Sequence, residues 1–122
     1  MIRNVWTAAG TAAALLLACA PARAASVKEI SGVAAYYSTD YHGRTASGER
    51  YDPKKFTCAH RTLPLGTRVR VTDPKTHRSV VVTVNDRGPF NKGRMIDLSL
   101  AAAKALHMID RGLIHVTAVV QQ

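Results

Sequence analysis

The sequence predicts a mainly β fold, a small β-barrel of five or six short strands with one or two short helices. Short segments alternate apolar and polar side chains, and Gly, Pro, Asp or Asn separates them. Residues that favour a helix are concentrated in one segment, 100–107. The 122 residues contain no internal repeat, which indicates one domain. Many short strands in one small domain favour a barrel, because closure removes the exposed edges of a sheet.

The first half of the chain is expected to hold one strand, a long loop and a helical turn. Residues 32–38 predict the strand, because a Gly is followed by apolar and aromatic side chains. Residues 39–51 form a polar loop, and loops of this length in compact domains usually have a function. Asp52 and Pro53 are typical of an N-cap and the first helical position, which predicts a helical turn through Phe56.

The second half begins with a predicted hairpin. Residues 67–72 alternate strictly, and Asp73-Pro74 suits the first two positions of a type I turn. Residues 78–84 return as the partner strand. Its second face carries Val81 and Thr83, so this strand is expected to be central.

Three more elements are expected beyond residue 90. Residues 95–98 predict a short strand, and Ser99 is placed to cap a helix over 100–107. Residues 113–120 alternate as a last strand.

The stretch 84–90, Val-Asn-Asp-Arg-Gly-Pro-Phe, is a candidate functional site. It follows a strand, so the carboxylate of Asp86 lies where regular structure stops, and Gly-Pro then enforces a turn. Asn85 and Arg87 flank the carboxylate with an amide and a guanidinium. An Asp–Arg ion pair that merely satisfies a loop explains these residues equally well.

Residues 1–25 are expected to form an export signal. A positive charge near the start precedes an apolar run, 7–20, that is too short to span a membrane. Ala-Arg-Ala at 22–24 suits cleavage before Ala25, which leaves 26–122 as the exported domain, in the periplasm or cell envelope.

A lipoprotein signal is the alternative. Leu16-Leu17-Ala18-Cys19 resembles a bacterial lipobox, in which Cys19 would be lipidated and become the mature N-terminus. The protein leaves the cytoplasm in both cases, and a lipid at Cys19 would be its only membrane attachment.

The charge balance suggests an anionic partner. Residues 26–122 retain 15 Lys and Arg against 8 Asp and Glu. In an exported protein such a balance favours a cell-wall polymer or lipid headgroups over nucleic acid. The basic residues are scattered, so a solvated basic surface is the simpler explanation.

No cofactor or metal is expected, because the spacing of the histidines His42, His77, His107 and His115 suggests no metal site. With Cys19 lost or lipidated, Cys58 is the one remaining thiol, and no disulfide can form within the domain. Cys58 lies two residues before His60, and a Cys close to a His is compatible with a nucleophile and its base, but a small buried side chain accounts for Cys58 better.

An ordered set of motifs resembles the rare-lipoprotein-A (RlpA) family of septal-ring lytic transglycosylases, whose fold is a double-psi β-barrel. The resemblance covers almost all of residues 32–120, and the order of the motifs is more specific than any one of them. The matching stretches are Gly32–Tyr37, His42–Arg44, Thr45–Asp52, Ala59–Gly66, Arg68–Thr72, Val84–Phe90 and Gly93–Ser99.

The resemblance implies roles for particular residues. Asp86, in Asn-Asp-Arg-Gly-Pro, corresponds to the family's catalytic aspartate, and Glu49 and His60 to its other important polar residues. Substrate contacts are expected from Asn85, Arg87, Tyr37 and His42. Without the family match, Glu49 and His60 are explained as a surface ion pair and a structural histidine, and Asp97 as a structural residue near the start of the helix.

The implied substrate is the glycan strand of peptidoglycan. Enzymes of this family cut between N-acetylmuramic acid and N-acetylglucosamine and leave 1,6-anhydro ends. The substrate's own C6 hydroxyl attacks, so one carboxyl, Asp86, can serve as acid and then base. A general acid needs a raised pKa, so Arg87 is expected to point away from Asp86, toward Asp97 or substrate, unless burial and Glu49 outweigh it.

Some positions depart from the family pattern. Cys58 replaces a usual Ala, the loop after Arg44 is one residue shorter, and Leu106-His107 replaces the usual Leu-Gly after the helix. The glycan-binding repeat domain (SPOR type) that some members carry is not expected. The domain is expected to be a monomer. The alternative function is a non-catalytic, expansin-like domain that binds or loosens the wall, because fold alone does not establish catalysis.

Overall fold

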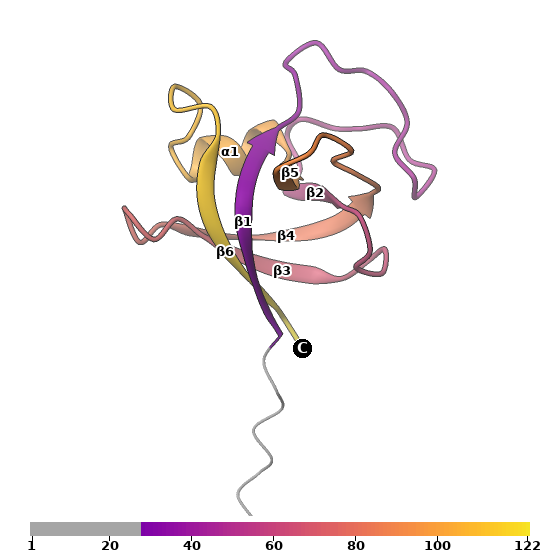
Figure 1. Cartoon of the computed structure of the whole chain (residues 1–122). Coiled ribbons are helices and arrows are strands. Elements are labelled where there is room, and N and C mark those ends of the chain that lie inside the picture. The colour runs from indigo at the N-terminus through magenta and orange to yellow at the C-terminus, as the bar shows by residue number, and fades with distance from the viewer. Residues whose placement is uncertain (1–27) are drawn as a thin grey trace, which may run out of the picture.

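The computed structural model describes residues 28–122 as a closed barrel of six strands with one short helix (Figure 1). The export signal and Cys19 lie outside the described residues. The elements are β1 (Glu29–Tyr36), β2 (Thr57–His60), β3 (Arg68–Thr72), β4 (Ser79–Asp86), β5 (Arg94–Leu98), α1 (Leu100–Ala105) and β6 (Ile114–Val120).

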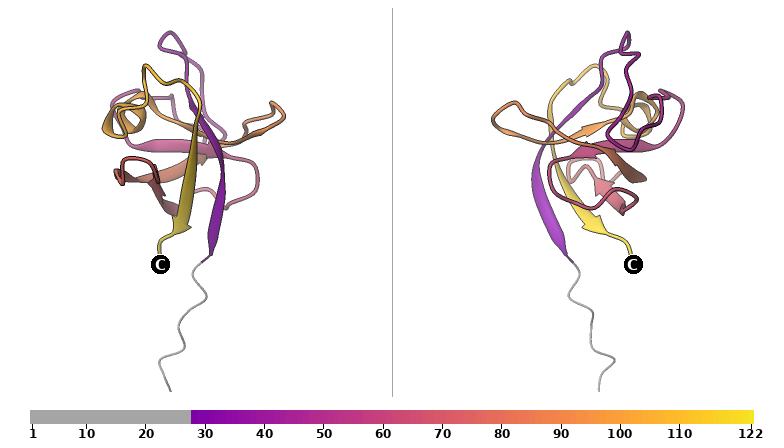
Figure 2. Two further views of the ribbon diagram at one scale, coloured as in Figure 1. Left: turned by 60° about the vertical axis from the view of Figure 1, so that its left-hand side comes forward. Right: turned by 90° about the vertical axis from the view of Figure 1, so that its right-hand side faces the viewer.

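The order of the strands around the barrel is β1-β5-β2-β4-β3-β6. The pairs β1–β5 and β2–β4 are parallel, and the other four neighbouring pairs are antiparallel. The two ends of the described chain meet, because β1 and β6 run side by side from Glu29 opposite Val119 (Figures 1 and 2). As predicted, β4 is central and lies between β2 and β3.

The structure corrects the prediction for residues 52–60. Asp52 opens a turn, in which Lys54 N–H donates to its Oδ1 at 2.9 Å and Lys55 N–H to its carbonyl at 3.2 Å, and no helix follows. The chain then forms β2, a strand that the sequence pattern did not predict. Of the one or two helices expected, the described residues contain α1 alone.

Two boundaries also differ from the prediction. Strand β1 begins at Glu29, because Glu29 to Ala34 pair with β6. The helix has its predicted cap, since Ser99 Oγ accepts from Ala102 N–H at 3.3 Å, but it ends at Ala105, and His107 is left-handed with φ 53°.

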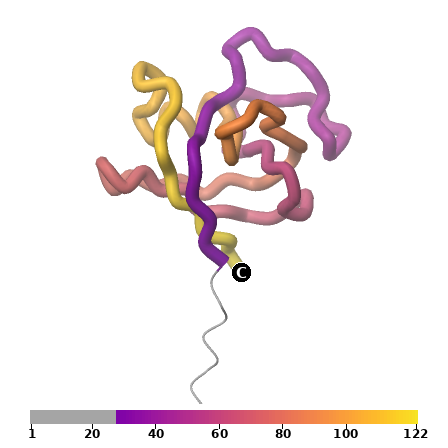
Figure 3. Tube along the Cα trace, in the orientation of Figure 1, coloured from indigo at the N-terminus to yellow at the C-terminus, as the bar shows by residue number. Residues whose placement is uncertain are grey.

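The interior is filled by small and medium apolar side chains on alternating strand positions. Val69 and Val71 of β3 point inward as predicted, and both are fully buried. The fully buried apolar side chains come from all six strands, from α1 and from the segment directly after it: Ala34, Cys58, Val69, Val71, Val84, Ile96, Leu98, Ala102, Ala103, Leu106, Met108, Val116 and Ala118. The polar loops therefore stand outside the barrel, where they are free to form a site (Figure 3).

Candidate active site

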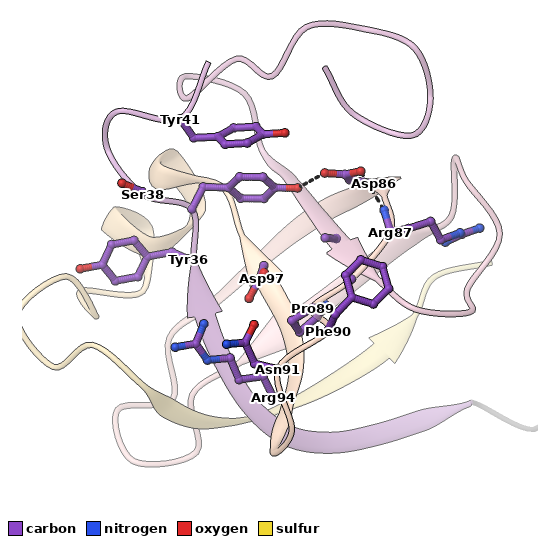
Figure 4. Close-up of a pocket in the computed structure, with 13 residues that line it drawn as sticks. Tyr36, Ser38, Tyr41, Asp86, Arg87, Pro89, Phe90, Asn91, Arg94 and Asp97 are labelled. Carbon is purple, nitrogen blue, oxygen red and sulfur yellow. Dashed lines mark hydrogen bonds between the residues drawn. The ribbon is translucent and has the colours of Figure 1, made fainter. Parts of the chain in front are cut away.

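A cleft of about 460 Å³ lies beside the ends of β1 and β4 (Figure 4). Two carboxyl groups, those of Asp86 and Asp97, line this cleft together with four aromatic side chains. Its lining residues are Tyr36, Tyr37, Ser38, Tyr41, Ala59, Asp86, Arg87, Gly88, Pro89, Phe90, Asn91, Arg94 and Asp97.

Strand β2 brings the two carboxyl groups together. Its residue Ala59 pairs with Asp86 of β4 on one side and with Asp97 of β5 on the other. Neighbouring strands lie about 4.8 Å apart, so the backbones of the two aspartates are separated by roughly 10 Å. The small, buried Ala59 lines the cleft between them.

Asp86 ends β4 and is held by three donors. Its Oδ2 accepts from the hydroxyl of Tyr37 at 2.6 Å, and its Oδ1 accepts from the backbone N–H groups of Ala46 at 2.8 Å and Arg87 at 2.9 Å. A carboxylate offers about four lone-pair directions. One is therefore left to accept a proton from a ligand.

Asp97 has a different environment. Its Oδ1 is buried and has no hydrogen-bond partner. Burial raises the pKa of this carboxyl, the charge of Asp86 raises it further, and Arg94 opposes the shift. Asp97 was expected to be a structural residue near the start of the helix, whereas it lines the cleft. The available signal was a single acidic residue inside an apolar strand.

Tyr37 connects the 39–51 loop to Asp86. Its ring stacks on Tyr51 with centroids 4.4 Å apart, and Tyr41 packs against both rings at 5.3 and 5.5 Å. Burial, followed by the hydrogen bond to Asp86, raises the pKa of Tyr37 far above its usual range. The phenol therefore stays protonated and donates to Asp86.

Two arginines join the turn at residues 60–63 to the 87–94 segment that lines the cleft. Arg87 turns away from Asp86 and donates to the carbonyls of His60 at 3.0 Å and Leu63 at 2.7 Å. In return, Arg61 donates to the carbonyls of Pro89 at 2.9 Å and Arg94 at 2.8 Å. The expectation that Arg87 points away is confirmed, but its partners are backbone carbonyls and not Asp97.

His60 is engaged with the backbone. Its Nδ1 accepts from the N–H groups of Thr62 and Leu63, both at 3.1 Å. Burial lowers the pKa of this imidazole, and the charges of Arg61, Lys28 and Arg87 add to the effect. His60 is therefore neutral at pH 7, and these bonds join it to neither Glu49 nor Asp86.

Glu49 lies beside the cleft and does not line it. Its Oε1 accepts from Ser47 Oγ at 3.1 Å and from Asn85 Nδ2 at 3.2 Å. Asn85 is buried, and its Oδ1 has no partner. His42 is exposed in the same loop. Of the seven residues expected to act on substrate, three line the cleft, namely Asp86, Arg87 and Tyr37. The other four, Glu49, His60, Asn85 and His42, do not line it.

The remaining candidates are inert. Cys58 is fully buried, and burial together with Asp97 raises the pKa of its thiol to about 12, so it is not a nucleophile.

Within residues 28–122, no three His, Cys, Asp or Glu side chains are grouped to hold a metal ion. The same part of the chain contains no helix long and apolar enough to cross a membrane.

A closed six-stranded barrel with two parallel pairs and polar loops at one rim is the architecture of a double-psi β-barrel domain. Residues 29–118 match the model of the lytic transglycolase family, and the chain belongs to that family. The fold and the family expected from the motifs are thereby confirmed.

Curated relatives have similar sequences over the same domain. The chain is 52% identical over 92 residues to a probable endolytic peptidoglycan transglycosylase RlpA of Synechocystis sp., covering 74% of this chain and 29% of that protein. It is 52% identical over 87 residues to the endolytic peptidoglycan transglycosylase RlpA of Neisseria meningitidis, covering 70% and 36%. The chain thus spans between a quarter and two fifths of these relatives.

Solved structures show the same barrel. The Streptomyces papain inhibitor superposes with a TM-score of 0.64 at 27% identity, over 78% of this chain and 96% of that one. A mutant Clavibacter michiganensis expansin in complex with cellohexaose superposes with a TM-score of 0.63 at 23% identity, over 78% and 51%. The second likeness concerns the fold alone.

Proposed function

We propose that this protein is an endolytic lytic transglycosylase, which cuts the β-1,4 bond between N-acetylmuramic acid and N-acetylglucosamine in peptidoglycan and leaves 1,6-anhydro ends. The observation that carries the proposal is the pair Asp86 and Asp97, two carboxyl groups with opposite environments in one cleft. Membership of the lytic transglycolase family and the names of the relatives support the same activity.

The two carboxyl groups divide the acid and base roles. Asp97, whose pKa is raised by burial, is assigned the acid role and protonates the leaving glycosidic oxygen. Asp86, whose three hydrogen-bonded partners are all donors, accepts the proton of the C6 hydroxyl as that oxygen bonds to C1. One proton leaves Asp97 and one reaches Asp86, so exchange with water restores the pair. Asp86 keeps the base half of the role expected for it, and the acid half passes to Asp97.

The residues around the cleft position this pair. Tyr37 holds Asp86, while His60 and Arg87 hold the loop that follows it. Glu49 is held by Ser47 of its own loop and by Asn85 of β4. Its carboxylate adds negative charge that stabilises the oxocarbenium-like transition state.

The setting of the activity is also a proposal. Export through the N-terminal signal would place the domain in the periplasm or cell envelope, with a lipid at Cys19 as the alternative anchor. A monomer with an excess of basic residues suits the anionic wall polymer.

The test compares the protein with Asp86→Asn and Asp97→Asn on peptidoglycan, both intact and stripped of stem peptides, with the soluble products identified by mass spectrometry. We expect anhydro-ended fragments from the parent and a loss of roughly 10²- to 10⁴-fold in either variant. Glu49→Gln should slow cutting without lowering the Tm. Full activity in Asp97→Asn would leave Asp86 as the sole acid and base, and products with reducing ends would indicate a hydrolase.

A non-catalytic wall-binding domain is the second candidate. This alternative is kept because the barrel superposes on about half of an expansin chain whose structure is in complex with cellohexaose, and because fold alone does not establish catalysis. Binding to the wall by the parent and both variants, without any released fragment, would establish this alternative.

A further inference from the structure

The most exposed large apolar side chain in the described part of the chain is Phe90, with 80% of its surface accessible. A single exposed apolar residue is ordinary. Phe90, however, lines the cleft that contains Asp86 and Asp97. A phenylalanine so exposed contributes little to folding, because most of its apolar surface stays in water. The ring is therefore available to a ligand.

The ring is also held in place. Gly88 has φ 122°, and a Cβ built on it would lie 3.4 Å from Cε2 of Phe90, so the ring packs over the glycine. On either side of Phe90, the carbonyls of Pro89 and Arg94 are bound by Arg61. Because the backbone that carries the ring is anchored, less conformational entropy is lost when a ligand covers the ring.

Other aromatic side chains line the same cleft as Phe90. In Figure 4, the ring of Tyr41 lies on one side of Asp97 and the ring of Phe90 lies on the other. Tyr37, whose ring packs against Tyr41, lines the same cleft as these two rings. A chain of sugar rings that reaches the two carboxyl groups would therefore pass between aromatic surfaces.

We infer that Phe90 is a substrate-contacting residue, whose ring stacks on the apolar face of a pyranose next to the bond that is cut. The inference depends on the proposed function for the identity of the sugar, a glycan strand with alternating N-acetylated rings. Axial C–H groups of a pyranose carry partial positive charge and meet the negative face of an aromatic ring. Binding energy gained at this neighbouring ring helps to hold the scissile bond between Asp86 and Asp97.

The test measures binding separately from cutting. Glycan strands freed of stem peptides are titrated by calorimetry into Asp86→Asn protein, alone and combined with Phe90→Ala, Phe90→Tyr or Phe56→Ala. Phe56 is the matched control, an aromatic side chain that is 49% exposed and does not line the cleft. We expect Phe90→Ala to raise the Kd roughly ten- to hundredfold. Phe90→Tyr and Phe56→Ala should stay within about twofold of the parent, and the Tm should be unchanged throughout.

Cutting is then measured with Asp86 intact, comparing Phe90→Ala with its parent on long strands. Unchanged binding in Phe90→Ala, an equal loss in Phe56→Ala, or no binding of glycan by the parent would overturn the inference. Normal cutting by Phe90→Ala would show that Phe90 has no role in substrate binding, and the proposed function would be unaffected. If glycan binding requires Phe90 but the protein releases no fragments, Phe90 remains a substrate-contacting residue and the proposed catalytic activity is wrong.

Discussion

The imidazole of His60 acts in this structure as an acceptor for two backbone N–H groups. These bonds shape the turn whose carbonyls hold Arg87, which in turn fixes the chain directly after Asp86. His60 therefore reaches the catalytic carboxylate only through another residue, and we assign it a positioning role. This differs from direct acid or base catalysis in a way that substitution can detect.

His60→Asn should retain much of the activity, whereas His60→Leu should lose it. The side-chain oxygen of Asn can occupy the place of Nδ1 and accept the same bonds, but Asn cannot transfer a proton at neutral pH. We expect His60→Leu to lower the free energy of unfolding by about 1–3 kcal/mol, because two N–H groups lose their acceptor. Initial rates on stripped peptidoglycan and chemical denaturation measure both effects. Equal inactivation by Asn and Leu would support a direct proton transfer instead.

The same site predicts a dependence on pH. The folded state lowers the pKa of His60, so below about pH 6.5 the unfolded chain binds a proton that the folded protein does not. The contribution of His60 to stability is thus complete above pH 6.5 and falls as the solution becomes more acidic. The parent should therefore lose stability from pH 7 to pH 5 relative to His60→Asn, as measured by its Tm.

Single residues also show how far sequence can predict the site. Asp86 was identifiable because it ends a strand and precedes Gly-Pro, which are local features. Asp97 was not, because it joins Asp86 only through the pairing of both with Ala59. That pairing depends on strands that are distant in the chain. The side chain of Arg87 was expected to point away from Asp86, but its carbonyl partners were not predictable, because they lie in a turn 24 and 27 residues earlier in the chain.

At the scale of elements, β2 and the end of α1 depart most from the prediction. Strand β2 has four residues and no alternation, since Thr57, Cys58 and Ala59 are all buried. It forms because β4 and β5 pair with it on both sides, a tertiary effect that overrides local preference. The segments with clear alternation, β3 and β6, were predicted nearly to their ends.

The C-terminus of α1 offers a test of local strain. His107 follows the C-cap in a left-handed conformation with φ 53°, where helices usually carry Gly. A residue with a Cβ pays about 1–2 kcal/mol there, of which the greater unfolded-state freedom of Gly cancels part. His107→Gly should therefore raise the free energy of unfolding by about 0.5–1 kcal/mol. Lys104→Gly, inside the helix, should lower it by about 1 kcal/mol. Denaturant titration of both variants would contradict the strain argument if His107→Gly destabilised the protein.

At the scale of the whole molecule, closure of the barrel joins segments from both ends of the chain. Strand β6 pairs with β1 and with β3, so the last strand completes the sheet. Near this closure, a fully buried Asp73 in the β3–β4 turn accepts from Arg111, which lies between α1 and β6, at 2.6 Å. This ion pair connects two loops 38 residues apart, and no sequence pattern indicated it.

Substitution of Arg111 should therefore lower the free energy of unfolding of the whole barrel. Asp73 would keep its bonds from Lys75 N–H and the Thr76 hydroxyl, while one lone pair of a buried carboxylate would lose its donor. Because Arg111 is one-third exposed, we expect Arg111→Gln to cost about 1–3 kcal/mol, less than the loss of a fully buried pair. Arg78→Gln, an exposed arginine in the same turn, should cost less than about 0.5 kcal/mol.

The pH dependence of the unfolding free energy tests whether the Arg111–Asp73 ion pair causes this loss of stability. The hydrogen bond from Arg111 lowers the pKa of Asp73, so this contribution to stability is complete above about pH 3.8 and is lost as the pH falls through the folded-state pKa. Urea denaturation of the parent and Arg111→Gln should therefore show a gap in unfolding free energy at pH 7 that narrows toward pH 2. A gap of equal size at both pH values would mean that Arg111 acts through packing of its aliphatic stem and not through its charge.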